Sequence, residues 1–562
     1  MKRIVVLIFI IPILAACVSG GGQKDSGINP AQQQVPFSKG VTFSKWFGET
    51  VISAQTIQFN KYVEQDFANV KKLGTDVIRL PISFNVLTSS APDYKIDPLF
   101  FKFLDTAVDW AEKYQIYIIL DNHPDWHDFK LSKDYRSFLI PVWTQIAEHY
   151  KNRSEYVIYE ILNEPSENDI PASSWGKMQG DVVDTIREID KNHWIVVSGL
   201  HTEQNPAIGL SYLPKYSDNK LLYTFHFYDP HVFTFQGDRE WPDASFGGIP
   251  FPYERSRMPK IPNKIKGTWI EDDLKNYPRT GTTAALTRKI DQIANFAKKR
   301  NVPVFCGEFG VMMWTCLPED RIRYNQFFNE ASEARNMPWI LWDSHGQCGI
   351  FNSPQQYGGD INTDLNVELV RALGLNPPPQ VQRHREPLKS SFTIYDDSLR
   401  RESALIFSQQ STLNMYYTPA AEGEYAIHWG NINRKGDSIT IEFTISDFTS
   451  FVQNGFAIEF KAKTGKQILF DVKLLNFQDN FSWHIGYTIT QRQLSPDGEW
   501  HTIRIPLRDM RLRGGVDNAT NQWVETKSKA ISWANTYALE VTMLNEDGYV
   551  CEIYLDHIKI TE

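Results

Sequence analysis

The stretch YVIYEILNEPSEN, residues 156–168, decides the fold. It begins as a continuous run of apolar, β-branched and aromatic residues and stops on Asn163-Glu164-Pro165. Continuous apolar strands are typical of parallel sheets that are covered by helices on their faces. Reactive groups of closed parallel barrels lie at the carboxyl ends of the strands. We therefore interpret this stretch as a barrel strand with Glu164 at its catalytic rim.

The same unit, a short apolar strand followed by a helix of 3.6-residue period, repeats between residues 36 and 375. The strands are expected near residues 40–44, 76–81, 116–121, 156–162, 194–198, 222–227, 302–306 and 338–342. This alternation predicts an α/β fold, a (β/α)₈ TIM barrel. An open dinucleotide-binding sheet would have a glycine-rich turn after its first strand, and the sequence has none there.

One interval of the barrel is long, between Tyr228 and Ala284. A long ordered loop after a barrel strand is usually functional, so we expect it to stand over the active face. Four aromatic residues in it are expected to shape a substrate groove: Trp241, Phe251, Tyr253 and Trp269. The alternative is a loop that only packs.

A polar, proline-rich linker, residues 376–388, separates the barrel from a C-terminal region of different texture, residues 389–562. Alternating strands such as SITIEFTIS, QILFDVKLLN and CEIYLDHIKI predict an antiparallel β-sandwich, a jelly roll. The segments WHTIRIPLRDM and IYLDHIKI resemble those of jelly-roll carbohydrate-binding modules. Candidate glycan-binding residues are Trp429, Trp483 and Tyr487, which core packing explains equally well; candidate ligands of a structural Ca²⁺ ion are Asp396, Asp397 and Asp556.

The N-terminus predicts export. Lys2-Arg3 precede a short apolar run that closes on Leu14-Ala15-Ala16-Cys17, which resembles a bacterial lipobox. We expect a signal peptide at residues 1–17, a lipid on Cys17, a flexible tether at residues 18–35, and a location at the outer membrane or cell surface. The alternative is secretion with cleavage near Ala16.

The composition limits the classes of molecule that the protein is expected to bind. A net charge of −9 and the absence of a basic block give no support for a nucleic-acid partner, and 42% hydrophobic residues exclude disorder. We expect a monomer. In an exported protein Cys316 and Cys348 are the first pair to test for a disulfide, whereas Cys306 and Cys551 lie in apolar strands and are expected to be buried thiols.

The strand ends gather chemically active side chains: Arg79, His123, Asn163, Glu164, His226, Tyr228, Glu308 and Trp342. Two carboxylates on the fourth and seventh strands, without a metal-ligand pattern, favour cleavage of a glycosidic bond. Glu160 lies about 13 Å deeper along the strand, where we expect a buried pairing with Arg79. Other acidic residues near the rim are expected to hold loops or contact substrate: Asp121, Asp125, Asp229 and Asp343.

The motifs YEILNEP and VFCGEFG resemble the two signatures of glycoside hydrolase family 5, the cellulase-type retaining enzymes, and VIRLPI, ILDNH, FHFYDP and ILWD match the family's other positions. The resemblance implies that Glu308 is the nucleophile and that Glu164 is the acid and then the base, holding its proton near neutral pH. It implies further that Arg79 and Tyr228 hydrogen-bond Glu308 and that His226 lies near Glu164. Asn163 would bind the sugar 2-hydroxyl and His123 other sugar hydroxyls. Trp342 would be the surface on which the sugar ring stacks.

We therefore expect an endo-acting hydrolase of β-1,4-glucan that needs no cofactor. A β-mannanase or β-1,3-glucanase of the same fold is the alternative. A non-catalytic glycan-binding protein would normally have lost one of the two carboxylates, and a metal-dependent hydrolase would need clustered His and Asp ligands that the strand ends lack.

Overall fold

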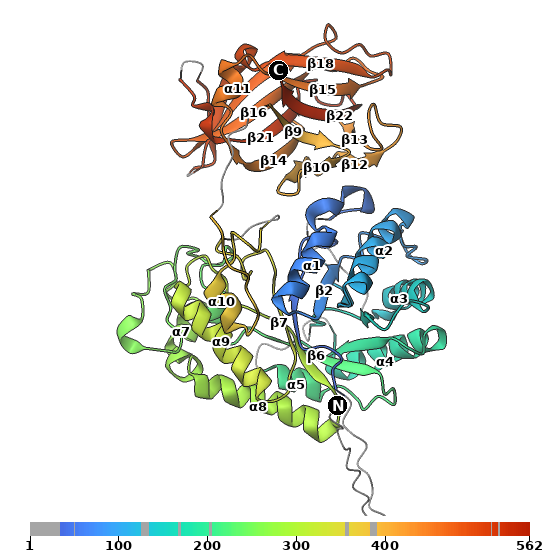
Figure 1. Ribbon diagram of the computed structural model, residues 1–562, viewed down its shortest axis with the longest axis vertical. Coiled ribbons are helices and arrows are strands. Elements are labelled where there is room, and N and C mark those ends of the chain that lie inside the picture. The colour runs from blue at the N-terminus through green and yellow to red at the C-terminus, as the bar shows by residue number, and fades with distance from the viewer. Residues whose placement is uncertain are drawn as a thin grey trace, which may run out of the picture.

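The computed structural model describes residues 34–49, 51–124, 134–166, 170–201, 205–353, 359–382, 390–518, 520–526 and 529–562. They form a helix-covered barrel and a β-sandwich stacked along the long axis of the molecule (Figure 1). The expected signal peptide, Cys17, most of the tether and Asp125 lie outside the described residues. Within the described ranges no helix is long and apolar enough to cross a membrane.

Eight parallel strands close into a barrel, which confirms the predicted TIM barrel. Their bounds are β1 Lys39–Thr42, β2 Val77–Ile82, β3 Tyr117–Asn122, β4 Val157–Glu160, β5 Trp194–Ser198, β6 Leu221–Phe227, β7 Val304–Phe309 and β8 Trp339–Leu341. Each predicted strand is present. β7 runs three residues beyond its predicted end at Cys306, so that Glu308 lies within the strand.

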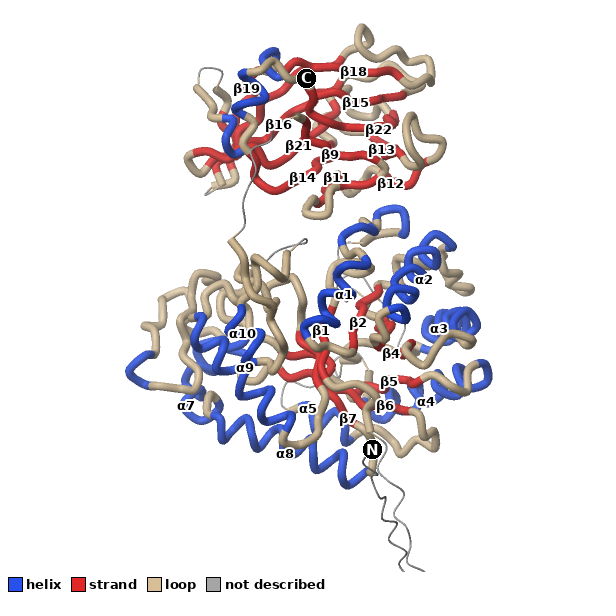
Figure 2. The backbone as a smooth tube through the Cα atoms, viewed as in Figure 1, coloured by secondary structure: helices blue, strands red, loops and turns tan. Residues whose placement is uncertain are grey.

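Helices surround the barrel (Figure 2). Their bounds are α1 Glu64–Leu73, α2 Pro98–Lys113, α3 Arg136–Tyr150, α4 Ala172–Ile189, α5 Pro206–Ser211, α6 His231–Thr234, α7 Trp269–Thr280, α8 Thr283–Arg300, α9 Pro318–Glu333 and α10 Val367–Ala372, with short 3₁₀ turns η1 Ala54–Thr56, η2 Phe59–Lys61 and η3 Arg255–Arg257. Local chemistry sets their ends. α2 starts where the Asp97 side chain accepts from the Leu99 amide, and α1 stops at Gly74, whose φ of 96° favours glycine.

The barrel interior is layered, and this layering positions the active groups. Its lower layer is an apolar cluster: Phe37, Val77, Ile119, Ile158, Val196, Leu222, Phe305 and Ile340. Side chains two residues apart on a strand point to the same face. Arg79, Asp121 and Glu160 follow Val77, Ile119 and Ile158 by two residues, so they form a charged layer directly above the apolar one, and all are buried.

The insertion between β6 and α8 is an ordered unit that carries α6, η3 and α7. Arg257 binds the buried Asp320 of α9, with Nη1 3.0 Å from Oδ1, and the Tyr277 hydroxyl donates to the carbonyl of Pro250 at 2.7 Å. Trp241 and Phe251 are buried inside this unit, so their predicted role in a groove is wrong. Tyr253 is partly buried against the same core, whereas Trp269 is 51% exposed.

The C-terminal domain is a sandwich of two antiparallel sheets, as predicted. Its elements are β9 Ser391–Asp396, β10 Ser398–Leu399, β11 Ala404–Phe407, β12 Thr412–Tyr417, β13 Ala426–Ile432, β14 Ser438–Ser446, α11 Thr449–Gln453, β15 Ala457–Lys463, β16 Phe470–Gln478, β17 Phe481–Ile489, β18 His501–Pro506, η4 Leu507–Asp509, β19 Arg511–Asp517, β20 Gln522–Val524, η5 Trp533–Asn535, β21 Thr536–Met543 and β22 Cys551–Thr561. One sheet holds β9, β10, β12, β13, β15, β18 and β22; the other has the order β11-β14-β21-β16-β17-β19-β20.

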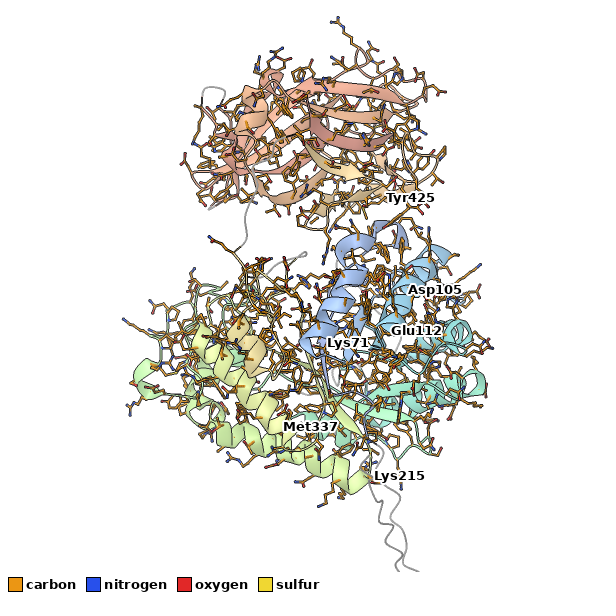
Figure 3. The ribbon with its side chains drawn as sticks, viewed as in Figure 1. Lys71, Asp105, Glu112, Lys215, Met337 and Tyr425 are labelled. Carbon is orange, nitrogen blue, oxygen red and sulfur yellow. The ribbon has the colours of Figure 1, made fainter. Side chains whose placement is uncertain are left out.

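Polar contacts join the two domains along η2, α1 and α2. Asp66 accepts from the Val63 amide at 2.8 Å at the start of α1, and both its carboxylate oxygens lie 2.7 Å from Arg401 Nη2 of the sandwich. Lys102 of α2 donates to the Tyr425 hydroxyl at 2.8 Å, and Tyr425 lies on the side of the sandwich nearest α2 (Figure 3). The domains are therefore held by specific contacts as well as by the linker.

One prediction about the sandwich is corrected, and one stays a prediction. Trp429 and Trp483 are buried, and Tyr487 packs partly buried against the core, so these rings offer no open stacking surface. Asp397 and Asp556 accept backbone amides of residues 421–425, and Asp396 contacts His557, so these carboxylates already have protein partners. A calcium ion there stays a prediction.

All four described cysteines, Cys306, Cys316, Cys348 and Cys551, are buried free thiols, and Cys316 and Cys348 are not bonded to each other.

Candidate active site

Glu164 and Glu308 meet at the carboxyl end of the barrel. Glu308 lies in β7, and Glu164 lies four residues beyond the end of β4. One carboxylate oxygen of each lies within 4.8 Å of the other and of a ring nitrogen of His226. Glu164 has a φ of 40°, in the left-handed region that non-glycine residues rarely adopt. Such backbone strain is concentrated at functional sites, where surrounding contacts hold it in place.

Arg79 organises the floor of the site. Its Nε and Nη2 each donate to Glu160 at 2.8 Å, which confirms the predicted buried pairing. Its Nη1 donates to Glu308 Oε1 at 2.7 Å. Nη2 also donates to Asn163 Oδ1 at 2.9 Å and lies 2.9 Å from Asp121 Oδ2. Burial lowers the pKa of Arg79, but the three carboxylates outweigh it and raise that pKa well above its ordinary value. The guanidinium therefore stays charged and fixes one oxygen of Glu308.

The other oxygen of Glu308 is held by Tyr228. The Tyr228 hydroxyl donates to Glu308 Oε2 at 2.8 Å. Burial, followed by the nearby charge of Glu308, raises the pKa of Tyr228 well above its ordinary value, so the hydroxyl keeps its proton and remains a donor. Hydrogen bonds to both oxygens hold the Glu308 carboxylate in a fixed orientation. Both contacts that the resemblance implied for Glu308 are present.

Glu164 and His226 form a proton-sharing pair. His226 Nδ1 lies 2.6 Å from Glu164 Oε1 and 3.6 Å from Glu308 Oε2. Burial lowers the pKa of His226, but Glu308 and Glu164 raise it further than burial lowers it. Burial raises the pKa of Glu164, but the hydrogen bond and charge of His226, with smaller contributions from His201 and His123, bring it below its usual range. In the free site the shared proton therefore resides on His226, whereas the acid role of Glu164 needs it on the carboxyl.

His123, Asn163 and Trp342 line the side of the site next to Arg79. His123 Nδ1 lies 2.8 Å from Asp121 Oδ2, and Asn163 Nδ2 lies 3.3 Å from His123 Nε2. The rings of His123 and Trp342 are nearly parallel, with centroids 5.5 Å apart and an interplanar angle of 20°. Burial lowers the pKa of His123, but Asp121 more than offsets it and the net shift is upward. An indole and polar donors thus lie beside the two carboxylates.

A cavity of about 600 Å³ opens next to Glu164 over the ends of β5 and β6. Its lining includes Glu164, His201, His226, His231, Trp269 and Asp273. His231 and Trp269 pack together with ring centroids 5.4 Å apart. This volume suits a small ligand beside Glu164. Of the four aromatic residues predicted to form a groove, Trp269 does line one.

The remaining acidic residues near the rim serve the scaffold. Asp343 is buried and bonds Ser44 and the Gly346 amide; burial raises its pKa to about 6. Asp229 lies beside the cavity and pairs with Lys289, with Oδ1 2.5 Å from Nζ. Both behave as the loop-holding groups that the sequence predicted. Asp121 does not, because it is fully buried between Arg79 and His123.

His201 is a site residue that sequence reasoning missed. It lies three residues beyond β5, and its Nδ1 is 3.6 Å from Glu164 Oε1. Its place just beyond a strand tip is the sequence signal that points to it.

Comparison with known proteins identifies the family. The family described as Cellulase (glycosyl hydrolase family 5) matches residues 38–347, more than half of the chain. Endoglucanase 3 of Fibrobacter succinogenes is 26% identical over 349 residues, which cover 58% of this chain and 52% of that protein. Endoglucanase C of Acetivibrio thermocellus is 27% identical over 331 residues, which cover 55% of this chain and 91% of that protein. The chain thus spans about half the length of the first relative and most of the second.

A similar solved structure is the endoglucanase Cel5A of Thermotoga maritima. It is 23% identical, with a TM-score of 0.48, and the match covers 60% of this chain and 96% of that one. The matched family region spans the eight barrel strands and contains both Glu164 and Glu308. The chain therefore belongs to glycosyl hydrolase family 5, the cellulase family.

Proposed function

We propose that the protein is an endo-acting, retaining glycoside hydrolase that cleaves β-1,4-glucan chains by double displacement. The observation that carries the proposal is the approach of Glu164 and Glu308, whose carboxylate oxygens lie within 4.8 Å of each other. Carboxyl groups about 5–5.5 Å apart are typical of retaining enzymes, whereas inverting enzymes hold theirs about 6.5–9.5 Å apart to admit a water molecule. The spacing leaves room for one sugar carbon between them.

In the first step, Glu308 attacks the anomeric carbon of the sugar and the bond to the leaving oxygen breaks. Arg79 and Tyr228 orient the two oxygens of Glu308 for this attack. The proton for the leaving oxygen comes through Glu164. In the free site this proton lies on the His226 side of the 2.6 Å hydrogen bond, so transfer to the leaving group draws it from His226 across Glu164.

In the second step, water enters where the leaving sugar was and Glu164 removes its proton. The water oxygen attacks the anomeric carbon and the bond to Glu308 breaks. Glu164 passes the proton that it took from water back to His226, which restores both carboxylates and the protonated histidine. Asn163 is positioned by Arg79 to bind the 2-hydroxyl, a contact that strengthens in the transition state. Trp342, held parallel to His123, supplies the apolar surface under the sugar. No cofactor takes part in either step.

The cavity next to Glu164 receives the leaving end of the chain. It lies on the acid side of the two carboxylates, and Trp269 provides an aromatic wall. The relatives' names, Endoglucanase 3 and Endoglucanase C, support endo action and a glucan substrate for this chain.

The proposed location is the outer membrane or cell surface, through a lipid on Cys17, with the enzyme acting as a monomer. The lipobox-like sequence before Cys17 supports this proposal. Cys17→Ala should release the protein from the membrane fraction of expressing bacteria and abolish incorporation of labelled palmitate. If the variant stays in the membrane fraction, the anchor is elsewhere.

Product analysis on a panel of soluble polysaccharides tests the proposed activity. Carboxymethylcellulose and mixed-linkage β-glucan should yield reducing ends together with a rapid fall in viscosity, and Glu308→Gln should abolish both. Cleavage of β-mannan or β-1,3-glucan alone would reassign the substrate. Binding of glucan without cleavage would overturn the enzyme assignment.

A further inference from the structure

The outer face of the second sheet of the sandwich carries a row of charged groups that are mostly buried. On β16, Val472 and Leu474 belong to the core, so Asp471 and Lys473 point to the opposite face. Lys473 Nζ donates to Glu540 Oε1 at 2.8 Å and to Thr542 at 2.9 Å. Asp471 accepts from Thr488 at 2.5 Å and from Arg513 at 3.1 Å.

This row spans three neighbouring strands. β16 is paired with β17 on one side and with β21 on the other, in a continuous antiparallel ladder. His484 of β17 reaches across to Glu540 of β21, with Nδ1 3.5 Å from Oε1. A Cβ atom at Gly486 of β17 would lie 3.0 Å from the Lys473 side chain and 3.2 Å from that of Arg513, so the glycine lets these two side chains lie close across the strand. The sheet therefore presents an ordered set of donors and acceptors, which we call the polar bed.

An exposed tryptophan lies at the edge of this bed. Trp523 of β20 is 50% exposed with the barrel in place. Its indole lies against Gly514, where an added Cβ would come within 2.4 Å of the ring. Its centroid is 5.2 Å from that of His484 in an edge-on arrangement. Contacts with a glycine and a histidine fix the ring, while half of its surface stays open.

We propose that this face, formed by Asp471, Lys473, His484, Arg513, Trp523 and Glu540, binds a neutral glycan chain. An indole stacks on the apolar face of a pyranose, and sugar hydroxyls need fixed donors and acceptors close to that face. The two acidic side chains are matched by Lys473 and Arg513, so the bed has no excess charge to attract a nucleic acid or an acidic polymer. That the chain is a β-glucan rests on the function proposed above.

The opposite face of the sandwich carries a cluster of aromatic rings that neighbouring side chains cover. Tyr554 is covered on one side by His428, with centroids 4.4 Å apart and an interplanar angle of 11°. Lys463 Nζ lies 4.3 Å from the centroid of Tyr554 and also approaches Tyr417 and Trp500. The rings of that cluster are paired with one another and with Lys463, which leaves the Trp523 face as the better surface for a sugar.

Affinity electrophoresis of the full chain tests the site. The parent protein carries Glu308→Gln, so that it does not cut the glucan in the gel. Trp523→Ala in this background should weaken retardation by mixed-linkage β-glucan about tenfold or more, as loss of a central aromatic contact does. Glu540→Gln, which keeps the shape of the side chain, should weaken it as well. Tyr549→Ala removes another aromatic side chain of the sandwich, 39% exposed, and should leave retardation unchanged.

The outcomes separate the binding site from the catalytic assignment. Equal retardation of the parent and Trp523→Ala, with matching circular dichroism and melting temperature, overturns the binding site. The binding site is also overturned if the unmutated enzyme hydrolyses β-glucan but no glucan retards the Glu308→Gln parent. In that case the catalytic proposal stands. Retardation that depends on Trp523 in a protein without hydrolytic activity supports the site and removes the catalytic proposal.

Discussion

Replacing Arg79 with methionine is expected to destabilise the barrel strongly. The change removes the guanidinium that contacts Glu160, Glu308 and Asp121, all buried, at 2.7–2.9 Å. Removing one partner of a buried charged pair costs about 3–5 kcal/mol, because the remaining charge is left without compensation. Since Arg79 serves three carboxylates, we expect the free energy of unfolding to fall by at least that amount, about 3–5 kcal/mol, at pH 8.

The loss of unfolding free energy caused by Arg79→Met should be larger at high pH than at low pH. Burial raises the pKa of Glu160, and Arg79 opposes that rise. Without Arg79, the folded-state pKa of Glu160 rises further above its unfolded value of about 4.3. A group whose pKa is raised in the folded state stabilises below its unfolded pKa and loses that contribution as pH rises through its folded pKa. Relative to the unmutated protein, Arg79→Met should therefore be more destabilised at pH 8 than at pH 5.

Urea unfolding followed by circular dichroism at 222 nm measures the effect on the barrel, because α1–α10 lie there and the described part of the sandwich has only the short α11. Arg136→Met is the matched control. Arg136 is 37% exposed and pairs with Asp134 and Asp181, so its loss should cost less than about 1 kcal/mol. A penalty below about 1 kcal/mol for Arg79→Met, or one equal at both pH values, would refute the reasoning.

Further predictions concern the site and the thiols. Tyr228→Phe removes the 2.8 Å hydrogen bond to Glu308 and should lower kcat/KM about 10- to 100-fold, as expected for a bond to a charged group; an unchanged value would exclude that role. The hydrolysis rate should fall at alkaline pH as the His226–Glu164 pair loses its proton. Because the pKa of His226 is raised from 6.5, the pH at which half the rate is lost should lie above that value. A midpoint near pH 4.5 would contradict the shared proton. Four thiols should react with Ellman's reagent in denatured, unreduced protein that lacks residues 1–33, whereas two would reveal a disulfide. Activity should survive EDTA, and its loss would favour a metal-dependent hydrolase.

The barrel could be predicted well from the sequence because each strand is an apolar run that is followed by a polar residue at its tip. The largest difference at a strand end is in β7, whose predicted end at Cys306 fell three residues short of Phe309. Gly307 and Glu308 look like a strand end in sequence, yet barrel pairing carries the backbone through them, with His226 opposite Glu308. Neighbouring strands override the local signal there.

Whether an aromatic residue is buried or exposed was harder to predict from the sequence, and the residues next to it in the chain explain why. Trp429 shares its strand face with Ile427, which faces the core, and the buried Phe251 stands in the apolar segment IPFPY. The exposed Trp269 and Trp523 stand instead in the polar segments KGTWIEDD and TNQWVETK. Counting tryptophans could not separate the two groups, whereas strand parity and the polarity of adjacent residues could have done so. His201 was missed because it lies three residues beyond the end of β5, past the strand tips where the candidate residues were expected.

Trapping the covalent intermediate tests the double-displacement mechanism most directly. A 2-deoxy-2-fluoro-β-cellobioside with a good leaving group should inactivate the enzyme, because the fluorine slows both steps and the good leaving group keeps formation of the glycosyl-enzyme faster than its hydrolysis. Mass spectrometry of the peptides should then find one cellobiosyl unit on Glu308. A label on Glu164 or another residue, or release of the α-anomer as first product with no adduct, would contradict the assigned roles.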